Sequence, residues 1–226
     1  MYNMSKYLLH VLIITFVFFL TPAIQSASGV EEDIEAYKQV VWIDPDDADA
    51  LYNLGAAFVK SGMNKEAIEA YKQVIRIDPD DVDVHNNLGV AYVKSGMNKE
   101  AIEAYKQAIR IDPDYAKAHS NLGVAYADSG MYKESIESCK QAIRIDPDYV
   151  KAHYNLGTAY ADLDMYKEAI ESYKHAIRID PDFTNAHFNL GLAYVLSNDR
   201  DSALDQYKTL KSLDSELANK LFKLNN

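Results

Sequence analysis

The stretch that decides the fold is residues 101–126, AIEAYKQAIRIDPDYAKAHSNLGVAY. A close copy, AIEAYKQVIRIDPDDVDVHNNLGVAY, occupies residues 67–92, and another, SIESCKQAIRIDPDYVKAHYNLGTAY, occupies residues 135–160, so the spacing is 34 residues both times. A fixed internal period of this length indicates a repeat architecture, in which each repeat is one supersecondary element. The period predicts five full repeats, which we number 1 to 5: residues 48–81, 82–115, 116–149, 150–183 and 184–217.

The pattern within each repeat predicts two helices joined by short loops. In repeat 1, apolar residues recur at helical spacing over residues 50–58 and again over residues 67–75. Ser61-Gly62 interrupts the pattern between them. Pro79 ends the repeat, because proline lacks an amide donor and disfavours helix in the residue before it. Loops this short predict that the two helices are antiparallel.

A glycine recurs inside the first helix of every repeat and needs a packing reason. In repeat 2 it is Gly89, and the second helix carries Ala101 and Ala108. A glycine inside a helix costs about 0.5–1 kcal/mol relative to alanine, so its repetition predicts that the two backbones approach closely. One such pair buries too little apolar surface by itself. The predicted fold class is therefore an all-α solenoid of stacked antiparallel helix pairs.

These marks together resemble the tetratricopeptide repeat (TPR) family over residues 31–217. The resemblance rests on marks that in repeat 3 are Leu122, Gly123, Ala125, Tyr126, Gly130 and Pro147. The departures from the family pattern are Ser135 and Cys139 in repeat 3, Asp164 in repeat 4, and Asn198 and Ser215 in repeat 5. The resemblance implies a right-handed solenoid.

The first residues have the layout of a signal peptide. Residues 1–28 contain Lys6, then an apolar run over residues 8–20, then small residues at 26–28. The run is short for a membrane span, which needs roughly 20 apolar residues. We expect an exported protein, periplasmic or secreted, with no membrane span after cleavage. The alternative is a membrane-anchored protein that keeps this segment as a signal anchor.

The two ends of the repeat array are predicted to be incomplete repeats. Residues 29–47 match a second helix without its first. Residues 218–226 end a capping helix whose Leu217, Leu221 and Leu224 are predicted to form one apolar stripe. Repeat arrays need such caps because an open end exposes apolar surface.

Charge and motif content exclude several classes of function. The formal net charge of −11 disfavours nucleic acid and anionic lipid as main partners. The sequence contains no Ser-His-Asp order, phosphate-binding loop or cysteine cluster, so we expect no enzyme and no cofactor. The single Cys139 cannot form an internal disulfide and is expected to be a buried thiol.

Histidine recurs at the fourth position of repeats 2 to 5: His85, His119, His153 and His187. Stacked helices hold these side chains too far apart for one tetrahedral ion, whose Zn–N bonds are about 2 Å. We expect a structural role for them and no metal site.

The family resemblance implies that the first helices line a concave groove. Asparagine recurs there at the sixth position of all five repeats: Asn53, Asn87, Asn121, Asn155 and Asn189. The TPR region of the protein-glycosylating O-linked N-acetylglucosamine transferases uses asparagine at this place to contact a peptide backbone, and an amide can both donate and accept hydrogen bonds. The alternative is that these amides serve inter-repeat hydrogen bonding.

The charges at the two ends of the first helix reverse between repeats 2 and 3. The second position holds Asp in repeats 1 and 2 and Lys in repeats 3 and 4: Asp49, Asp83, Lys117 and Lys151. The thirteenth position holds the opposite charges: Lys60, Lys94, Asp128 and Asp162. With the fifth-position residues Tyr52 and Tyr154, this layout predicts a groove that orients a charged peptide. The alternative is that Asp and Lys pair along or between neighbouring first helices.

We therefore expect a scaffold that binds a protein or an extended peptide in the groove, in the assembly of a bacterial envelope complex. Two alternatives stay open. One is a structural protein that self-associates through its array ends, and the other is a non-catalytic accessory of an envelope enzyme complex.

Overall fold

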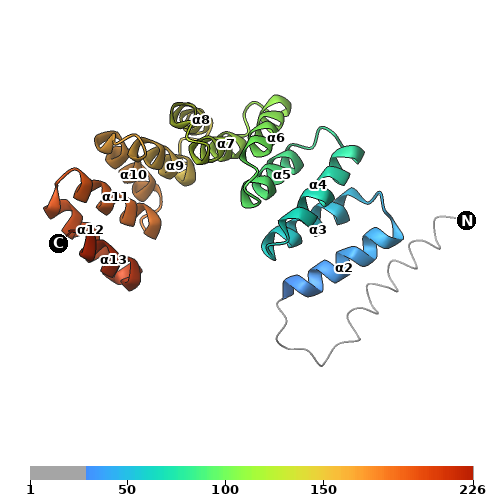
Figure 1. Cartoon of the computed structure of the whole chain (residues 1–226), viewed down its shortest axis with the longest axis horizontal. Coiled ribbons are helices and arrows are strands. Elements are labelled where there is room, and N and C mark those ends of the chain that lie inside the picture. Colours follow the sequence, from blue (N-terminus) through green and yellow to red (C-terminus); the bar gives the residue numbers. More distant parts are fainter. Residues whose placement is uncertain (1–28, 226) are drawn as a thin grey trace, which may run out of the picture. The chain divides into compact units, whose positions relative to one another are not determined.

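The computed structural model describes residues 29–225, and within them the chain forms twelve α-helices and no strand (Figure 1). Two compact units divide the chain, the first ending at Pro79 and the second beginning at Asp80. The predicted signal segment, residues 1–28, lies outside the described residues. Between residues 29 and 225, no helix is both long and apolar enough to cross a bilayer.

The first unit holds the partial repeat and repeat 1. Its helices are α2 (Gly29–Ile43), α3 (Ala48–Lys60) and α4 (Asn64–Ile77), and α3 packs against both of the others. Ile34 of α2 and Leu51 of α3 are buried in this contact region.

The second unit holds repeats 2 to 5 and the C-terminal helix. Its helices are α5 (Val82–Lys94), α6 (Asn98–Ile111), α7 (Ala116–Asp128), α8 (Tyr132–Ile145), α9 (Val150–Ala161), α10 (Tyr166–Ile179), α11 (Thr184–Leu196), α12 (Arg200–Leu213) and α13 (Ser215–Asn225). Each first helix packs on the second helix of its own repeat, and α7, α9 and α11 also pack on the second helix of the repeat before them, as Figure 1 shows for α7 to α12. The prediction of stacked helix pairs is confirmed.

The turn between the two helices of a repeat requires a left-handed backbone. Gly62, Gly96 and Gly130 have φ of 79°, 72° and 74° at this place. In repeats 4 and 5 it is held by Asp164 and Asn198, with φ of 57° and 63°. Asp and Asn are the non-glycine residues that tolerate this region best, so the two departures from the family pattern keep the same turn.

The recurring glycine makes room for an aromatic ring in three of the five repeats, which the predicted close approach of the two backbones did not include. A Cβ on Gly89 would lie 2.5 Å from the Tyr105 ring, and a Cβ on Gly157 would lie 2.6 Å from the Tyr173 ring. The notch above these glycines therefore admits a tyrosine ring from the paired helix.

Helix α13 closes the C-terminal end of the second unit. Leu221 is fully buried and lies over Gly191, in the notch that a tyrosine fills in other repeats. Tyr207, which has the corresponding position in repeat 5, packs instead on Phe222 at 5.2 Å between ring centroids. The predicted stripe was wrong for Leu224, whose side chain is 49% exposed.

Candidate functional site

The predicted asparagine ladder is part of the contact between neighbouring repeats. Asn121 Nδ2 donates to Asn86 Oδ1 at 2.9 Å, and Asn155 Nδ2 donates to Ser120 Oγ at 3.1 Å. Asn189 Nδ2 donates to the Tyr154 hydroxyl at 3.0 Å. Each bond joins a sixth-position asparagine to the fifth-position residue of the repeat before it. Inter-repeat hydrogen bonding, one of the two predicted roles of these amides, is present at all three.

The fifth position therefore supplies the acceptor of these inter-repeat hydrogen bonds. It carries a hydrogen-bond acceptor in repeats 2, 3 and 4, each of which is followed by another asparagine. In repeat 5 it is Phe188, which cannot accept such a bond and is instead covered by the Lys220 ammonium group of α13, 5.3 Å from the ring centroid. Asn86 and Ser120 are 5% and 1% exposed, so neither contributes to a peptide-binding surface.

The asparagines themselves remain half-buried at the surface of the first helices. We define the first-helix face as the surface of α5, α7, α9 and α11 that carries Asn87, Asn121, Asn155 and Asn189. An amide whose Nδ2 is held by the preceding repeat has a fixed orientation, because the group is planar. In Asn121, Asn155 and Asn189 the direction of Oδ1, a hydrogen-bond acceptor, is therefore fixed as well.

The corresponding positions of the first unit lie on α3. Asn53 and Tyr52 are half-buried, and the Tyr52 ring lies 6.0 Å from that of Tyr71. Asp49 is exposed in the first turn of the helix.

The predicted acidic site residue Asp83 takes part in a contact with the next repeat. The Tyr115 hydroxyl donates to its carboxylate, and Lys117 Nζ lies 5.8 Å from the centroid of the same Tyr115 ring. Tyr115 precedes α7 at the N-cap position, where repeat 2 has Asp81, whose carboxylate caps Val84 N at 3.0 Å. Tyr115 stands where repeat 2 has a capping aspartate, and this replacement is the sequence signal from which the contact could have been predicted.

Asp128 and Asp162 lie at the ends of the neighbouring helices α7 and α9, and both are exposed. Burial first, and then the nearby Asp128 carboxylate, raise the pKa of Asp162 above its ordinary value. Lys117 and Lys151 are exposed at the opposite ends of the same two helices.

The recurring histidines hold the loops that precede the first helices. His119, His153 and His187 each place Nε2 within 2.8–2.9 Å of a proline carbonyl six residues earlier. Within residues 29–225, no group of three or more His, Cys, Asp or Glu side chains is arranged to hold a metal ion. The loop contacts give these histidines a structural role.

The second helices carry a solvated charged surface. Lys72, Lys106, Lys140 and Lys174 each pair with the glutamate three residues earlier, at 3.1–3.6 Å. Exposed pairs of this kind contribute little to stability, and they mark this surface as a suitable control for binding experiments.

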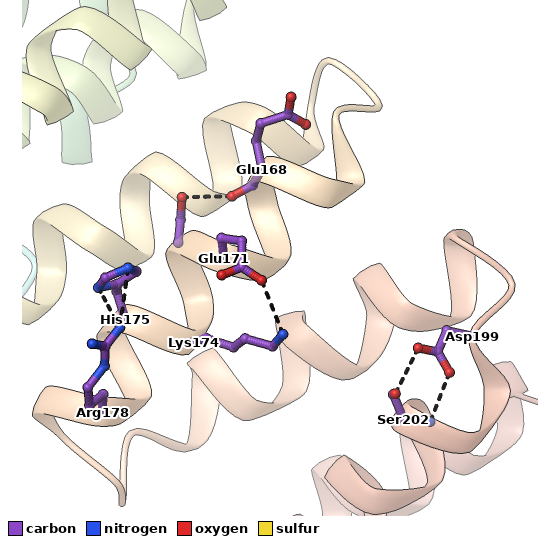
Figure 2. A network of polar contacts seen from close by, with 8 residues as sticks. Glu168, Glu171, Lys174, His175, Arg178, Asp199 and Ser202 are labelled. Carbon is purple, nitrogen blue, oxygen red and sulfur yellow. Dashed lines mark hydrogen bonds and ion pairs between the residues drawn. The ribbon is translucent and has the colours of Figure 1, made fainter.

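A pocket of about 460 Å³ lies between α8, α9 and α10. Its apolar part includes Ile143, Leu156 and Tyr160, and its polar part includes His153 and His175. The two imidazoles stack with their centroids 5.4 Å apart and their planes within 9°. Figure 2 shows His175 beside Arg178, whose Nη2 lies 2.8 Å from Nδ1 of the imidazole, and Glu171 paired with Lys174.

A matching pocket of about 410 Å³ in the first unit includes Val41, Leu54 and Phe58. Leu51 and Gln73 stand there in place of the two histidines. The imidazole pair is therefore a property of repeat 4, and its sequence signal is His175, which stands where repeats 1, 2 and 3 have glutamine.

The stacked pair of His153 and His175 predicts that the stability of the fold depends on pH. Burial, then Arg178 and then His153 lower the pKa of His175 in the folded chain. As the pH falls below about 6.5, the ordinary pKa of histidine, the unfolded chain takes up this proton more readily than the folded chain, so stability is lost. The variant His175→Gln, with the residue found at Gln107 and Gln141, is expected to lose less stability on acidification. Melting temperatures of both proteins between about pH 7.5 and pH 5 check this. A difference between the two melting temperatures that does not change with pH would contradict it.

The single cysteine is buried, as predicted. Cys139 is fully buried, and burial raises the pKa of its thiol to about 12. The thiol is therefore protonated and inert in the folded chain.

The fold and the face together define a class of protein: a helical-repeat protein whose stacked hairpins present their first helices on one surface. The family model described as TPR repeat matches residues 30–62, 57–96, 91–130, 125–164 and 159–198. The chain therefore belongs to the tetratricopeptide repeat family, and its fold is a TPR solenoid.

No curated protein sequence matches the chain, but many solved structures resemble it. The crystal structure of MamA is 31% identical with a TM-score of 0.64, and the match covers 74% of this chain and 97% of that one. YrrB, described as a TPR protein with an unusual peptide-binding site, is 21% identical with a TM-score of 0.60, covering 84% and 99% of the two chains. TTC0263, a thermophilic TPR protein of Thermus thermophilus, is 23% identical with a TM-score of 0.66, covering 78% and 98%. The last two show the fold alone.

Proposed function

We propose that this TPR chain is a non-catalytic scaffold that holds an extended peptide segment of a partner protein on its first-helix face. The observation that carries the proposal is the orientation of the asparagine amides. The preceding repeat fixes Nδ2 of Asn121, Asn155 and Asn189, so that each Oδ1 is an oriented acceptor for a peptide N–H. Acceptors that recur once per repeat suit a partner backbone, whose donors also recur regularly. The peptide-binding site named for YrrB supports the same use of the fold.

We propose an exported location and a role in the assembly of a bacterial envelope complex. The support is the N-terminal sequence, with Lys6, the apolar run and the small residues that come after it. An accessory of an envelope enzyme would use the same surface and is a variant of the same proposal.

The test separates contact with the peptide from the structural hydrogen bond. A partner is first recovered by cross-linking from envelope fractions of the native cells. It is then titrated against Asn155→Ala and against Ser120→Ala, both of which break the inter-repeat bond. Each variant is expected to cost about 0.5–1.5 kcal/mol of stability, whereas only Asn155→Ala removes the amide that faces the peptide.

We expect Asn155→Ala to weaken binding about threefold to tenfold, with a smaller loss in Ser120→Ala, where the amide is still present but no longer held by a hydrogen bond. The outer-surface variant Glu137→Ala/Glu171→Ala is the control for charge and is expected to bind normally. Equal loss in Asn155→Ala and Ser120→Ala would assign the ladder to structure alone, and loss only in the outer-surface variant would exclude the first-helix face.

Self-association through the array ends remains the second candidate, because Trp42 of α2 is 84% exposed. The same helix also carries a feature that opposes it. Asp33 is exposed at the position where Ala67 of α4 is fully buried, so a helix docked there in the manner of a repeat would bury a carboxylate. Light scattering over a range of concentrations distinguishes a self-assembling chain from a monomeric scaffold.

A further inference from the structure

The four end charges of α7 and α9 oppose the dipoles of their own helices. Lys117 and Lys151 lie in the first turns, and Asp128 and Asp162 lie at the C-terminal ends. A helix N-terminus carries partial positive charge and a C-terminus partial negative charge, so all four charges are at the unfavourable end. Helix α5 of the same unit has the favourable order, with Asp83 in the first turn and Lys94 in the last.

The same four charges form no ion pair within the described residues. The lysines of the neighbouring second helices α8 and α10, by contrast, pair with Glu137 and Glu171. Lys117 contacts only the face of an aromatic ring. Asp162 faces a like charge, and burial together with the Asp128 carboxylate makes its ionised form less favourable. Local rules broken without compensation inside the chain are a mark of functional surfaces.

We propose that the surface of α7 and α9 is a dipolar docking patch for a peptide of mixed charge. Its carboxylates bind Lys117 and Lys151, and its Lys or Arg side chains bind Asp128 and Asp162. The proposal rests on the proposed function and specifies the chemistry of the peptide. Two pairs of unlike charge, separated along the helices by about 16 Å at 1.5 Å per residue, select against partners of a single sign.

An extended peptide that crosses α7 and α9 between the two charged edges meets this requirement. Successive side chains of an extended chain point to opposite sides. A segment that alternates acidic and basic residues therefore presents carboxylates to the lysine edge and ammonium groups to the aspartate edge. The amides of Asn121 and Asn155 lie between the edges, on the same two helices.

The first experiment measures specificity with three synthetic peptides of equal length: alternating Glu and Lys, all Glu, and all Lys. Fluorescence anisotropy at low ionic strength keeps screening weak, since the Debye length is about 30 Å at 10 mM salt. The parent chain is expected to bind the alternating peptide about tenfold more tightly than either other peptide. Lys117→Asp/Lys151→Asp is expected to prefer all Lys, and Asp128→Lys/Asp162→Lys to prefer all Glu.

The second experiment measures stability in the absence of any ligand. Exchanging all four charges keeps the net charge and gives α7 and α9 the favourable order of α5. The melting temperature is expected to rise by about 2–4 °C. The matched control for the peptide titrations exchanges the outer pairs, with Glu137→Lys/Lys140→Glu and Glu171→Lys/Lys174→Glu, and is expected to leave peptide preference unchanged.

The proposal is overturned if the parent chain binds no alternating peptide, binds all three equally, or keeps its preference in the two double variants. An unchanged melting temperature in the fourfold exchange also counts against it, because the charges would then be satisfied without a partner. Asn155→Ala is expected to weaken the binding of all three peptides without changing their order of affinity. If that effect persists while the charge effects fail, the proposed function stands and only the mixed-charge partner falls.

Discussion

The variant Gly123→Leu is expected to melt about 6–12 °C below the parent chain, the result of about 3 kcal/mol of overpacking. A Cβ at this position would lie 2.6 Å from Cys139 Sγ and 3.2 Å from the carbonyl oxygen of Ser135. The carbonyl belongs to the backbone of α8 and cannot move without displacing that helix. Leucine adds three further carbons at the same place.

The damage is expected to reach the neighbouring repeats, because each repeat is stabilised by its contacts with the next. Hydrogen exchange checks this, with lost protection expected in α5 to α10 rather than in α7 and α8 alone. The control is Val124→Leu, one residue away on the half-buried side of the same helix, with an expected change within about 0.5 kcal/mol. Equal melting of Gly123→Leu and the parent chain would show that α7 and α8 do not pack at this glycine.

The variant Leu221→Ala is expected to lose about 2–5 kcal/mol of stability, the usual cost of truncating a buried leucine. Leu221 is fully buried against Gly191 and belongs to a cluster with Leu210 and Ala218. Truncation opens a cavity between α13 and the helices that it covers. Urea unfolding of the whole chain measures the loss.

Leu224→Ala is the matched control for this second prediction. It removes the same atoms from the same helix, but Leu224 is 49% exposed, so a change within about 0.5 kcal/mol is expected. Similar losses in the two variants would mean that α13 does not cap the array through Leu221.

Much of the fold was predictable because its signals are local. The apolar residues at helical spacing, the interruption at Ser61-Gly62 and the proline at the end of a repeat each affect the backbone only within a few residues. The sequence showed Asp164 and Asn198 only as departures from the family pattern, and the structure places both in the left-handed turn, which these residues tolerate.

The site was predictable only in part. The sequence placed Asn121 and Asn155 on one face of the first helices and left two roles for them open. Their bonding partners, Asn86 and Ser120, lie 35 residues away in the chain, and no local pattern links the two positions. A separation of 32 residues likewise hid the contact of Tyr115 with Asp83.

The sequence by itself determined the helical repeat, its period and the places where the helices end, because apolar periodicity, glycine and proline act within short segments. Only the tertiary structure decided that a ring of Tyr105 or Tyr173 fills the glycine notch, that Leu221 replaces such a ring at Gly191, and that Lys151 and Asp162 stay without an ion pair in the described chain. Those outcomes depend on which side chains meet across neighbouring helices. The repeat period predicts that the repeats stack, but it does not predict which side chains fill the space between them.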